Sequence, residues 1–334
     1  MRRLVWLAVV FALLWSGWWF FAASTLQAGI EAWLAERRGE GWQAEVTEIS
    51  MSGYPNALDA VLQRPVLADP QTGVVFEASS LRINASAFWP GFVSLVFPAD
   101  EMIFASPEQR RTAIAQDAVA DLRLHPGTDL ELEEMALTAG LWTLAAPEGT
   151  VLGARALTLR MRQDAEDPTL YDLMLDAPAF QPGSVPRRAL RVPADWPVTF
   201  DSLALDMSVA FDRAVDRTAI EVSRPQPRRI DLRLAEAVWG TLLIRSAATL
   251  DVAETGLLSG EVSLQARNWQ DMLTLAESAG TLPSAMRPQI ENVLSALARS
   301  GGNPDTIDVT IAIREGTMFM GFVPLGAAPR LILR

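Results

Sequence analysis

A run of twenty uncharged residues near the N-terminus, LVWLAVVFALLWSGWWFFAA at positions 4–23, constrains this chain more than any other feature. At ~1.5 Å of rise per residue, a helix of that length spans ~30 Å, the thickness of the hydrocarbon core of a bilayer. Ten of its residues are Leu, Val or Phe, and each favours insertion at the helix centre by roughly 0.3–0.6 kcal/mol. Residues 1–23 are therefore predicted to form a short N-terminal tip and a transmembrane anchor.

Charged and aromatic residues predict the orientation of this anchor. Arg2 and Arg3 precede the run, so the positive-inside rule keeps the N-terminus in the cytoplasm and exports the rest of the chain. Trp15, Trp18 and Trp19 gather toward the opposite end, where indole rings favour the headgroup region. The alternative is a cleaved signal peptide, because 22–24 offer small residues. The length of the run and its bulky aromatic residues favour an anchor that is retained.

Composition excludes several function classes. The chain has no cysteine, which excludes disulfides, thiol nucleophiles, iron–sulfur clusters and cysteine zinc sites. The net charge is −12 and all 28 basic residues are arginine, so nucleic acid is not an expected partner. We therefore expect a body that is held together by packing alone, without cofactors.

Hydrophobic periodicity predicts a helix followed by many strands. Residues 24–40 place apolar side chains on one helical face and predict an amphipathic stalk, which packs against the body or lies on the membrane surface. From Trp42 onward the period changes to two, which is typical of strands with one buried face. The strand segments predicted between turn signals are 74–84, 93–105, 112–124, 129–138, 151–163 and 169–175.

These segments predict a mainly β (α+β) fold, in which the anchor is followed by a long antiparallel meander and a C-terminal helical hairpin. A first β half at 41–176 is joined by a proline-rich connection at 177–197 to a second half at 198–334, with helices at 268–300 and a terminal β-hairpin. The sheet could stack as a sandwich, close as a barrel or curl into an open trough. The candidate apolar lining of a trough comprises Leu203, Leu205, Met207, Val209, Phe211, Ile230, Leu232 and Leu234.

Three short motifs resemble a family of membrane-anchored envelope proteins from alphaproteobacteria, domain of unknown function 2125. They are ISMSGYP at 49–55, NWQDML at 268–273 and GFVPLGAAPRL at 321–331. The residues that carry the resemblance are Gly53, Tyr54, Pro55, Trp269, Pro324, Leu325, Gly326 and Pro329. The plan of one anchor and a β-rich body also resembles the AsmA-type envelope proteins, whose folded sheets are associated with lipid transport. The resemblance implies placement in a bacterial inner membrane with a periplasmic body, and it supplies no catalytic residues.

Residues with catalytic or ligand-binding chemistry are few. His125 is the single histidine, and its place before a proline suits a turn as well as a catalytic triad or a zinc site. Acidic residues at 131–134 and 164–167 could supply paired carboxylates or calcium ligands, although no EF-hand spacing is present. Arg187, Arg188 and Arg191 could grip lipid head groups with their planar guanidinium groups, or simply be solvated in a loop. We therefore expect no enzyme, with a hydrolase as the remote alternative.

The function that the sequence favours is maintenance of the cell envelope, in which membrane lipids bind to or pass along an apolar groove. The alternative is a non-enzymatic scaffold that binds another envelope protein through a sheet edge or the proline-rich loop. These hypotheses differ in the shape that they require, because only the first needs an apolar sheet face that stays partly uncovered.

Overall fold

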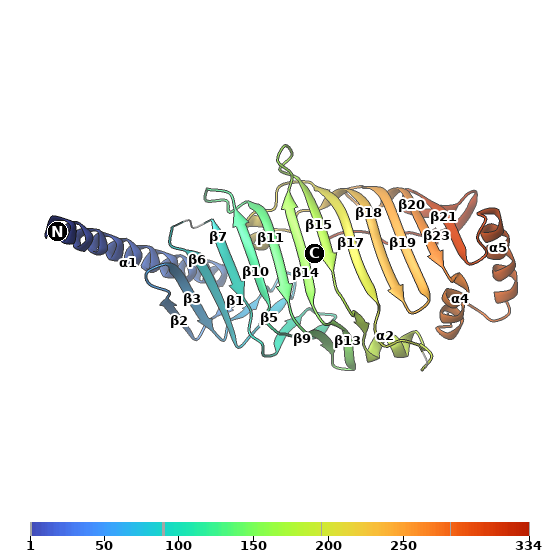
Figure 1. Ribbon diagram of the computed structural model, residues 1–334, viewed down its shortest axis with the longest axis horizontal. Coiled ribbons are helices and arrows are strands. Elements are labelled where there is room, and N and C mark those ends of the chain that lie inside the picture. Colours follow the sequence, from blue (N-terminus) through green and yellow to red (C-terminus); the bar gives the residue numbers. More distant parts are fainter. Residues whose placement is uncertain (1, 89–90, 195, 281, 334) are drawn as a thin grey trace. The chain divides into compact units, whose positions relative to one another are not determined.

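The computed structural model describes residues 2–88, 91–194, 196–280 and 282–333 (Figure 1). The chain divides into two compact units. The first comprises Met1–Pro126 and Ala136–Gly140, and the second comprises Gly127–Met135 and Leu141–Arg334. The fold is mostly β, with open antiparallel sheets, one long N-terminal helix and a helical region near the C-terminus, so the predicted fold class is confirmed.

The predicted anchor and stalk form one uninterrupted helix, α1 (Arg2–Gly39). Its first part is exposed, whereas Trp19, Ala23 and Leu34 are buried against the first unit. The helix ends where Gly39 and Gly41 follow Arg38, and Gly41 has a φ of +90°, a conformation that glycine adopts readily. The stalk thus packs against the β body, one of the two arrangements that its amphipathic pattern predicted.

The strands of the first unit form two sets of antiparallel neighbours. One set has the order β1-β4-β5-β8-β9 and the other has the order β2-β3-β6-β7-β10. The bounds are β1 (Gln43–Glu45), β2 (Glu48–Ser52), β3 (Ala57–Gln63), β4 (Val66–Ala68), β5 (Val75–Glu77), β6 (Ser80–Ser86), β7 (Phe92–Val96), β8 (Met102–Ala105), β9 (Arg110–Ala115) and β10 (Val119–Leu124). A further strand, β11 (Leu132–Ala139), contributes residues to both units.

The two sets are the two leaves of one folded sheet, because long strands bend from one leaf into the other. Between β3 and β4 the chain turns at Arg64, which has a φ of +49°, and at the buried Pro65. The adjacent strand turns between β5 and β6, and backbone hydrogen bonds from Arg64 N to Ser79 O (2.9 Å) and from Ala78 N to Pro65 O (3.2 Å) carry the pairing through the bend. The segments predicted at 74–84, 93–105 and 112–124 are therefore each divided into two strands by a corner.

The second unit begins with a similar bend and continues as a meander. Its leaves have the orders β12-β13-β16 and β14-β15-β17-β18-β19-β20-β21-β22-β23. The strands are β12 (Trp142–Ala146), β13 (Gly149–Ala154), β14 (Leu157–Gln163), β15 (Leu170–Asp176), β16 (Gln181–Pro182), β17 (Ser202–Phe211), β18 (Pro227–Trp239), β19 (Leu242–Val252), β20 (Leu258–Arg267), β21 (Thr306–Arg314), β22 (Thr317–Met320) and β23 (Val323–Ala327). Short helices α2 (Ser184–Ala189) and α3 (Thr218–Glu221) interrupt the meander, and α2 lies within the predicted proline-rich connection.

The predicted helical hairpin is present as α4 (Trp269–Ser278) and α5 (Arg287–Ser300). Trp269 is 1% exposed and packs with Leu273, Ala266 and Ile307 in one cluster. Its indole Nε1 donates a hydrogen bond to Pro304 O at 3.0 Å. This tryptophan, a member of the NWQDML motif, therefore joins both helices to strands β20 and β21.

We predict that Trp269→Ala weakens this end of the second unit by about 3–5 kcal/mol, because it opens a large cavity and removes the indole donor. Trp269→Phe keeps most of the ring volume and should cost only about 1–2 kcal/mol. Hydrogen exchange of the β21 and α5 amides in detergent measures this local stability without assuming that the whole chain unfolds in one step. Val293→Ala on the exposed side of α5 is the control, and equal protection in Trp269→Ala and Val293→Ala would contradict the prediction.

Candidate functional site

One face of the sheet formed by β14 to β21 in the second unit is apolar along its strands. Met207 of β17 lies opposite both Leu173 of β15 and Leu232 of β18. Opposite partners share a face of the sheet, and the same face continues where Val262 of β20 pairs with Ile311 of β21. The strands lie side by side in Figure 1. The alternation seen in the sequence therefore produces one extended aliphatic surface.

The opposite face of these strands carries charges that form ion pairs both along a strand and between nearby strands. The ion pairs are Arg228–Asp212, Arg229–Asp231, Arg229–Asp251, Arg233–Asp172, Arg233–Asp206 and Arg245–Glu236. Hydrogen bonds hold several carboxylates ionised. The pKa of Asp172 is lowered by the Ser208 hydroxyl and by Arg233, and the pKa of Glu236 is lowered mainly by Arg245. This polar face suits contact with water, which leaves the aliphatic face to be covered by something apolar.

A β-bulge in β18 moves one predicted lining residue to the polar face. The register shifts between Leu232 and Ala235, so that Leu234 lies opposite Asp206 whereas Leu232 lies opposite Met207. Arg233 of the same bulge reaches Asp172 and Asp206 on the polar face. Strict alternation would keep Leu232 and Leu234 on one face, and the extra residue of the bulge reverses this.

The aliphatic face is covered at both ends of its strands. The cluster around Trp269 includes Ala266 and Ile307 at one end. At the other end, Ala328 and Leu331 of the C-terminal tail pack on a cluster that contains Ile230, Leu250 and Ile313. Between these ends lies a middle band of half-buried side chains: Leu205, Met207, Leu232, Leu264, Val309 and Ile311. The middle band is thus the part of the face that lies outside both buried clusters.

Two of the predicted lining residues, Val209 and Phe211, are covered by other side chains of the second unit. Val209 is buried, and Phe211 packs edge-on against Tyr171 with ring centroids 5.9 Å apart. The Tyr171 side chain is 0% exposed, and burial raises the pKa of its hydroxyl. This hydroxyl accepts a hydrogen bond from Val215 N at 3.0 Å. Phe211, Val209 and Ile230 therefore belong to a covered end of the face, and Leu203 lies toward the other end, opposite Ala237.

The three arginines of the proline-rich segment gather at one pocket of about 610 Å³ in the second unit. Arg187 Nη1 donates to Pro197 O at 2.8 Å, and Arg188 Nη2 donates to Glu148 O at 2.7 Å. Arg191 lines the same pocket. Each bound guanidinium group keeps further N–H donors, so the described lining concentrates positive charge in one place.

In the first unit, α1 covers the corresponding apolar face. Trp19 and Ala23 pack against Leu58 of β3 and Ala85 of β6. The indole of Trp19 donates to Ala57 O at 2.8 Å, and that of Trp15 donates to Pro55 O at 3.0 Å. Trp18 Nε1 donates to Ala87 O at 3.4 Å. The predicted aromatic belt of the anchor is therefore also a set of contacts with the β body, which the sequence did not indicate.

The family-like motif at 49–55 forms the surface that receives this helix. Gly53 has a φ of +98°, and a Cβ there would lie 2.6 Å from Ala57 O, so the turn requires glycine. The Tyr54 hydroxyl hydrogen-bonds Ser16 Oγ at 2.8 Å, and its ring meets Trp19 at 5.5 Å. In the third motif, Pro324, Leu325 and Gly326 belong to the exposed strand β23, which the chain leaves just before Pro329 and the tail.

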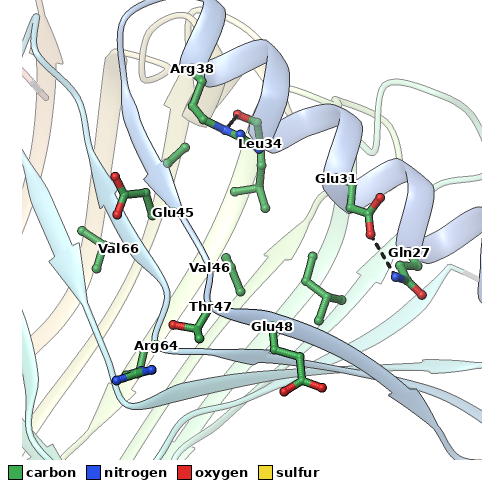
Figure 2. A pocket seen from close by; sticks show the side chains of 12 residues that line it. Gln27, Glu31, Leu34, Arg38, Glu45, Val46, Thr47, Glu48, Arg64 and Val66 are labelled. Carbon is green, nitrogen blue, oxygen red and sulfur yellow. Dashed lines mark hydrogen bonds between the residues drawn. The ribbon is translucent and has the colours of Figure 1, made fainter.

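A second pocket, of about 660 Å³, lies between the last turns of α1 and the bend that joins β1 to β2 (Figure 2). Leu34 and Val46 contribute apolar surface, whereas Glu31, Glu48 and Arg64 contribute charges. Glu31 accepts a hydrogen bond from Gln27 at 2.9 Å. Mixed charge and open shape make this pocket a hydrated crevice rather than an apolar binding cavity.

The acidic clusters considered for catalysis or metal binding have structural partners. Asp164 Oδ1 accepts a hydrogen bond from Glu166 N at 2.8 Å. Asp167 Oδ1 accepts one from the Thr169 hydroxyl at 2.7 Å and one from Thr169 N at 2.8 Å, and these bonds, the hydroxyl first, lower the pKa of Asp167. Glu131 accepts a hydrogen bond from Gln163 at 2.6 Å. Across the described ranges, no three His, Cys, Asp or Glu side chains are grouped as metal ligands would be. The cluster at 164–167 is therefore a turn that is closed by hydrogen bonds to its own carboxylates.

These features define a β-rich protein with an N-terminal helix that is long and apolar enough to cross a membrane. The family model described as "uncharacterized protein conserved in bacteria", the domain of unknown function 2125, matches residues 19–329, and the chain belongs to this family. The family resemblance seen in the three motifs is thereby confirmed. No curated protein matches the chain.

The ion-paired face predicts how stability depends on pH. Asp172, Asp231 and Glu236 have folded pKa values below their ordinary values, through Ser208, Arg229 and Arg245 respectively. Their stabilisation is complete above the unfolded pKa of about 4 and is lost as the pH falls through the folded values. We expect the thermal midpoint in detergent to change little from about pH 7 to 6 and to drop below about pH 4.

Arg245→Gln removes the main partner of Glu236, so this variant should start with a lower midpoint and lose less on acidification. Arg299→Gln is the control, because the Nε of Arg299 bonds the Ser295 carbonyl of its own helix. The same pH dependence in Arg245→Gln, Arg299→Gln and the unchanged protein would show that the paired carboxylates do not set acid stability.

Proposed function

We propose that this protein is a membrane-tethered component of the bacterial cell envelope whose aliphatic sheet face binds lipid acyl chains and passes them along. The observation that carries the proposal is the middle band. Its side chains stay half-buried between two well-covered ends, while the other face of the same strands is ion-paired. The architectural resemblance to AsmA-type proteins supports the same assignment. The closed acidic turn at 164–167 and the absence of a nucleophile elbow in the sequence favour a non-enzymatic role.

The energetics of such a face suit transfer rather than storage. Moving an acyl chain from water onto an apolar surface gains about 0.8 kcal/mol per buried methylene. Moving the same chain from a bilayer onto that surface gains almost nothing, because both surroundings are apolar. A face of this kind therefore lowers the cost of taking a lipid out of the membrane without trapping it.

We further propose that the anchor is retained, with the body in the periplasm. Trp15, Trp19 and Ala23 lie before the candidate cleavage site and contact the first unit. Cleavage at that site would uncover Leu58 and Ala85 and remove indole hydrogen bonds to the body. Sequencing of the mature N-terminus tests this part of the proposal, and a chain that begins near Ser24 would contradict it.

The pocket of Arg187, Arg188 and Arg191 is our candidate for contact with an anionic head group. Guanidinium groups match phosphate oxygens in a bidentate geometry. The same pocket adjoins Val192 and Val198, so apolar surface lies beside the charges. This combination of adjacent positive and apolar surface is what a phospholipid head with the start of its acyl chains requires.

Photocrosslinking from the bulge of β18 tests the acyl-chain proposal with a matched control. A benzophenone amino acid at Leu232 reports on the aliphatic face, and the same group at Leu234 reports on the polar face of the same strand. We expect lipid adducts, identified by mass spectrometry after extraction from cells, at position 232 and several-fold fewer at position 234. The two sites are two residues apart, so expression and membrane placement should be equal.

Other outcomes separate the alternatives. Equal lipid adducts at both positions would show that the face has no special role. One dominant protein adduct at position 232, with little lipid, would favour the scaffold. A hydrolytic activity of the purified protein that is lost in His125→Ala would establish the enzyme instead.

A further inference from the structure

The contacts of α1 conflict with a body that hangs clear of the membrane. Within the uncharged run 4–23, residues 4–14 precede the first residue that contacts the β body, Trp15. Those eleven positions span only about 16 Å at 1.5 Å per residue, roughly half of the ~30 Å that a bilayer core requires. The remaining part of the run, 15–23, would have to lie in the membrane while it is packed against the first unit.

The part of the first unit beside this stretch has the chemistry of a membrane-facing surface. Tyr54 in the β2–β3 turn is 52% exposed, and Phe88 after β6 is 68% exposed. Phe88 stacks on Trp15 with ring centroids 4.7 Å apart, and Tyr54 stacks on Phe20 at 6.3 Å. Exposed aromatic rings that adjoin a transmembrane helix are typical of the bilayer interface.

Immersion requires that the strands carry no charge near the tip and carry charges farther from it, and the sequence of these strands meets this requirement. The segments 49–58 and 83–99 contain no charged residue. At the other end of these strands, near the corner of the folded sheet, the chain carries Glu48, Arg64 and Glu77. On β10, Arg123 pairs with Phe92 at the tip end of β7 and lies over its ring at 5.6 Å. The long stem of an arginine allows its guanidinium group to reach the headgroup level.

We propose that the tip of the first unit, the β2–β3 turn at 53–56 together with Ala87 and Phe88, is immersed in the leaflet that faces the body. The missing ~14 Å of span corresponds to the nine residues 15–23 and to about four residues of adjacent strand at ~3.3 Å each. About that length of chain separates Pro55, inside the turn, from Asp59, whose carboxylate is the first charge along β3 and accepts a hydrogen bond from Asn84. The partner of this surface is the lipid itself.

Immersion brings the exposed tip of the first unit into direct contact with acyl chains, so this inference rests on the proposed tether and extends the proposed lipid function. In this arrangement Leu58 and Ala85 stay covered by Trp19, and the exposed rings of Tyr54 and Phe88 contact the acyl chains. A lipid would enter from the side of the acyl chains and would not need to cross a layer of water. The tip, rather than the stalk, is then the element that places the sheet against the membrane.

The absence of cysteine allows single cysteines to be labelled with an environment-sensitive fluorophore in the full-length protein, reconstituted into dioleoyl phosphatidylcholine vesicles. Asn56→Cys places the label at the exposed tip, Gln71→Cys places it in the exposed β4–β5 turn of the same unit, and Val10→Cys places it on α1. We expect lipid-borne nitroxides to quench the labels at 10 and 56 several-fold more than the label at 71. A water-soluble quencher should show the reverse order.

The three labels distinguish failure of this inference from failure of the tether. Lipid quenching at 10 with water exposure at 56 would overturn immersion and leave the tether in place, whereas water exposure at 10 would overturn both. Strong lipid quenching at 71 would also overturn tip immersion, because the whole unit would then lie on the membrane. Phe88→Asp should reduce lipid quenching at 56, and Phe104→Asp, an equally aromatic but remote exposed position, should not.

Discussion

The organisation of this protein depends on one constraint, namely that a strand with strict alternation has one apolar face which must be covered. In the first unit, Trp19 and Ala23 of α1 cover that face at its edge. In the second unit, helices α4 and α5 and the C-terminal tail cover the two ends of the strands. The chain has no cysteine, so the body depends on these coverings rather than on disulfides. These coverings leave the middle band half-buried, and the lipid proposal rests on this band.

The hydrogen bonds of the tryptophans in α1 give this long apolar helix a role within the folded protein. An indole ring at the end of a transmembrane helix satisfies its N–H by bonding water or lipid head groups. In this protein the rings of Trp15 and Trp19 bond backbone carbonyls of the β body instead. The helix is therefore held in a fixed relation to the first unit rather than joined to it by a free linker.

Much of the fold could be predicted from the sequence, because the alternation of apolar and polar residues in every second position is a strong signal for strands. The segments predicted at 74–84 and 112–124 contain the whole of β5 and β10 and most of β6 and β9. The bends within them were not predictable, because a strand keeps its alternation across a corner such as Ala78-Ser79. The bulge in β18 was missed for a similar reason, since Leu232, Arg233 and Leu234 read as perfect alternation. Bends and bulges depend on how a strand pairs with its neighbour, and a local sequence pattern contains no information about that neighbour.

Two features of the candidate sites differ in how far they depend on tertiary structure. One is the contact between Trp15 and Pro55, and the other is the pocket shared by Arg187, Arg188 and Arg191. The arginines are close in sequence, and a short helix was enough to gather them. The tryptophan contact joins residues forty positions apart. The uncharged run 4–23 is apolar on nearly every side, so its sequence does not indicate which side of the helix contacts protein. Only the structure shows the contact surface of α1.

The corner of the folded sheet has a consequence for how such a body changes in length. Each bent hairpin, such as β3–β4 followed by β5–β6, pairs only with the hairpins before and after it. A chain built in this way can gain or lose one bent hairpin without disturbing the pairing of the others, as in repeat proteins. Members of a family with this architecture can therefore differ by whole hairpins while the remaining hairpins keep their pairing, so that the number of strands varies independently of the pairing within each hairpin.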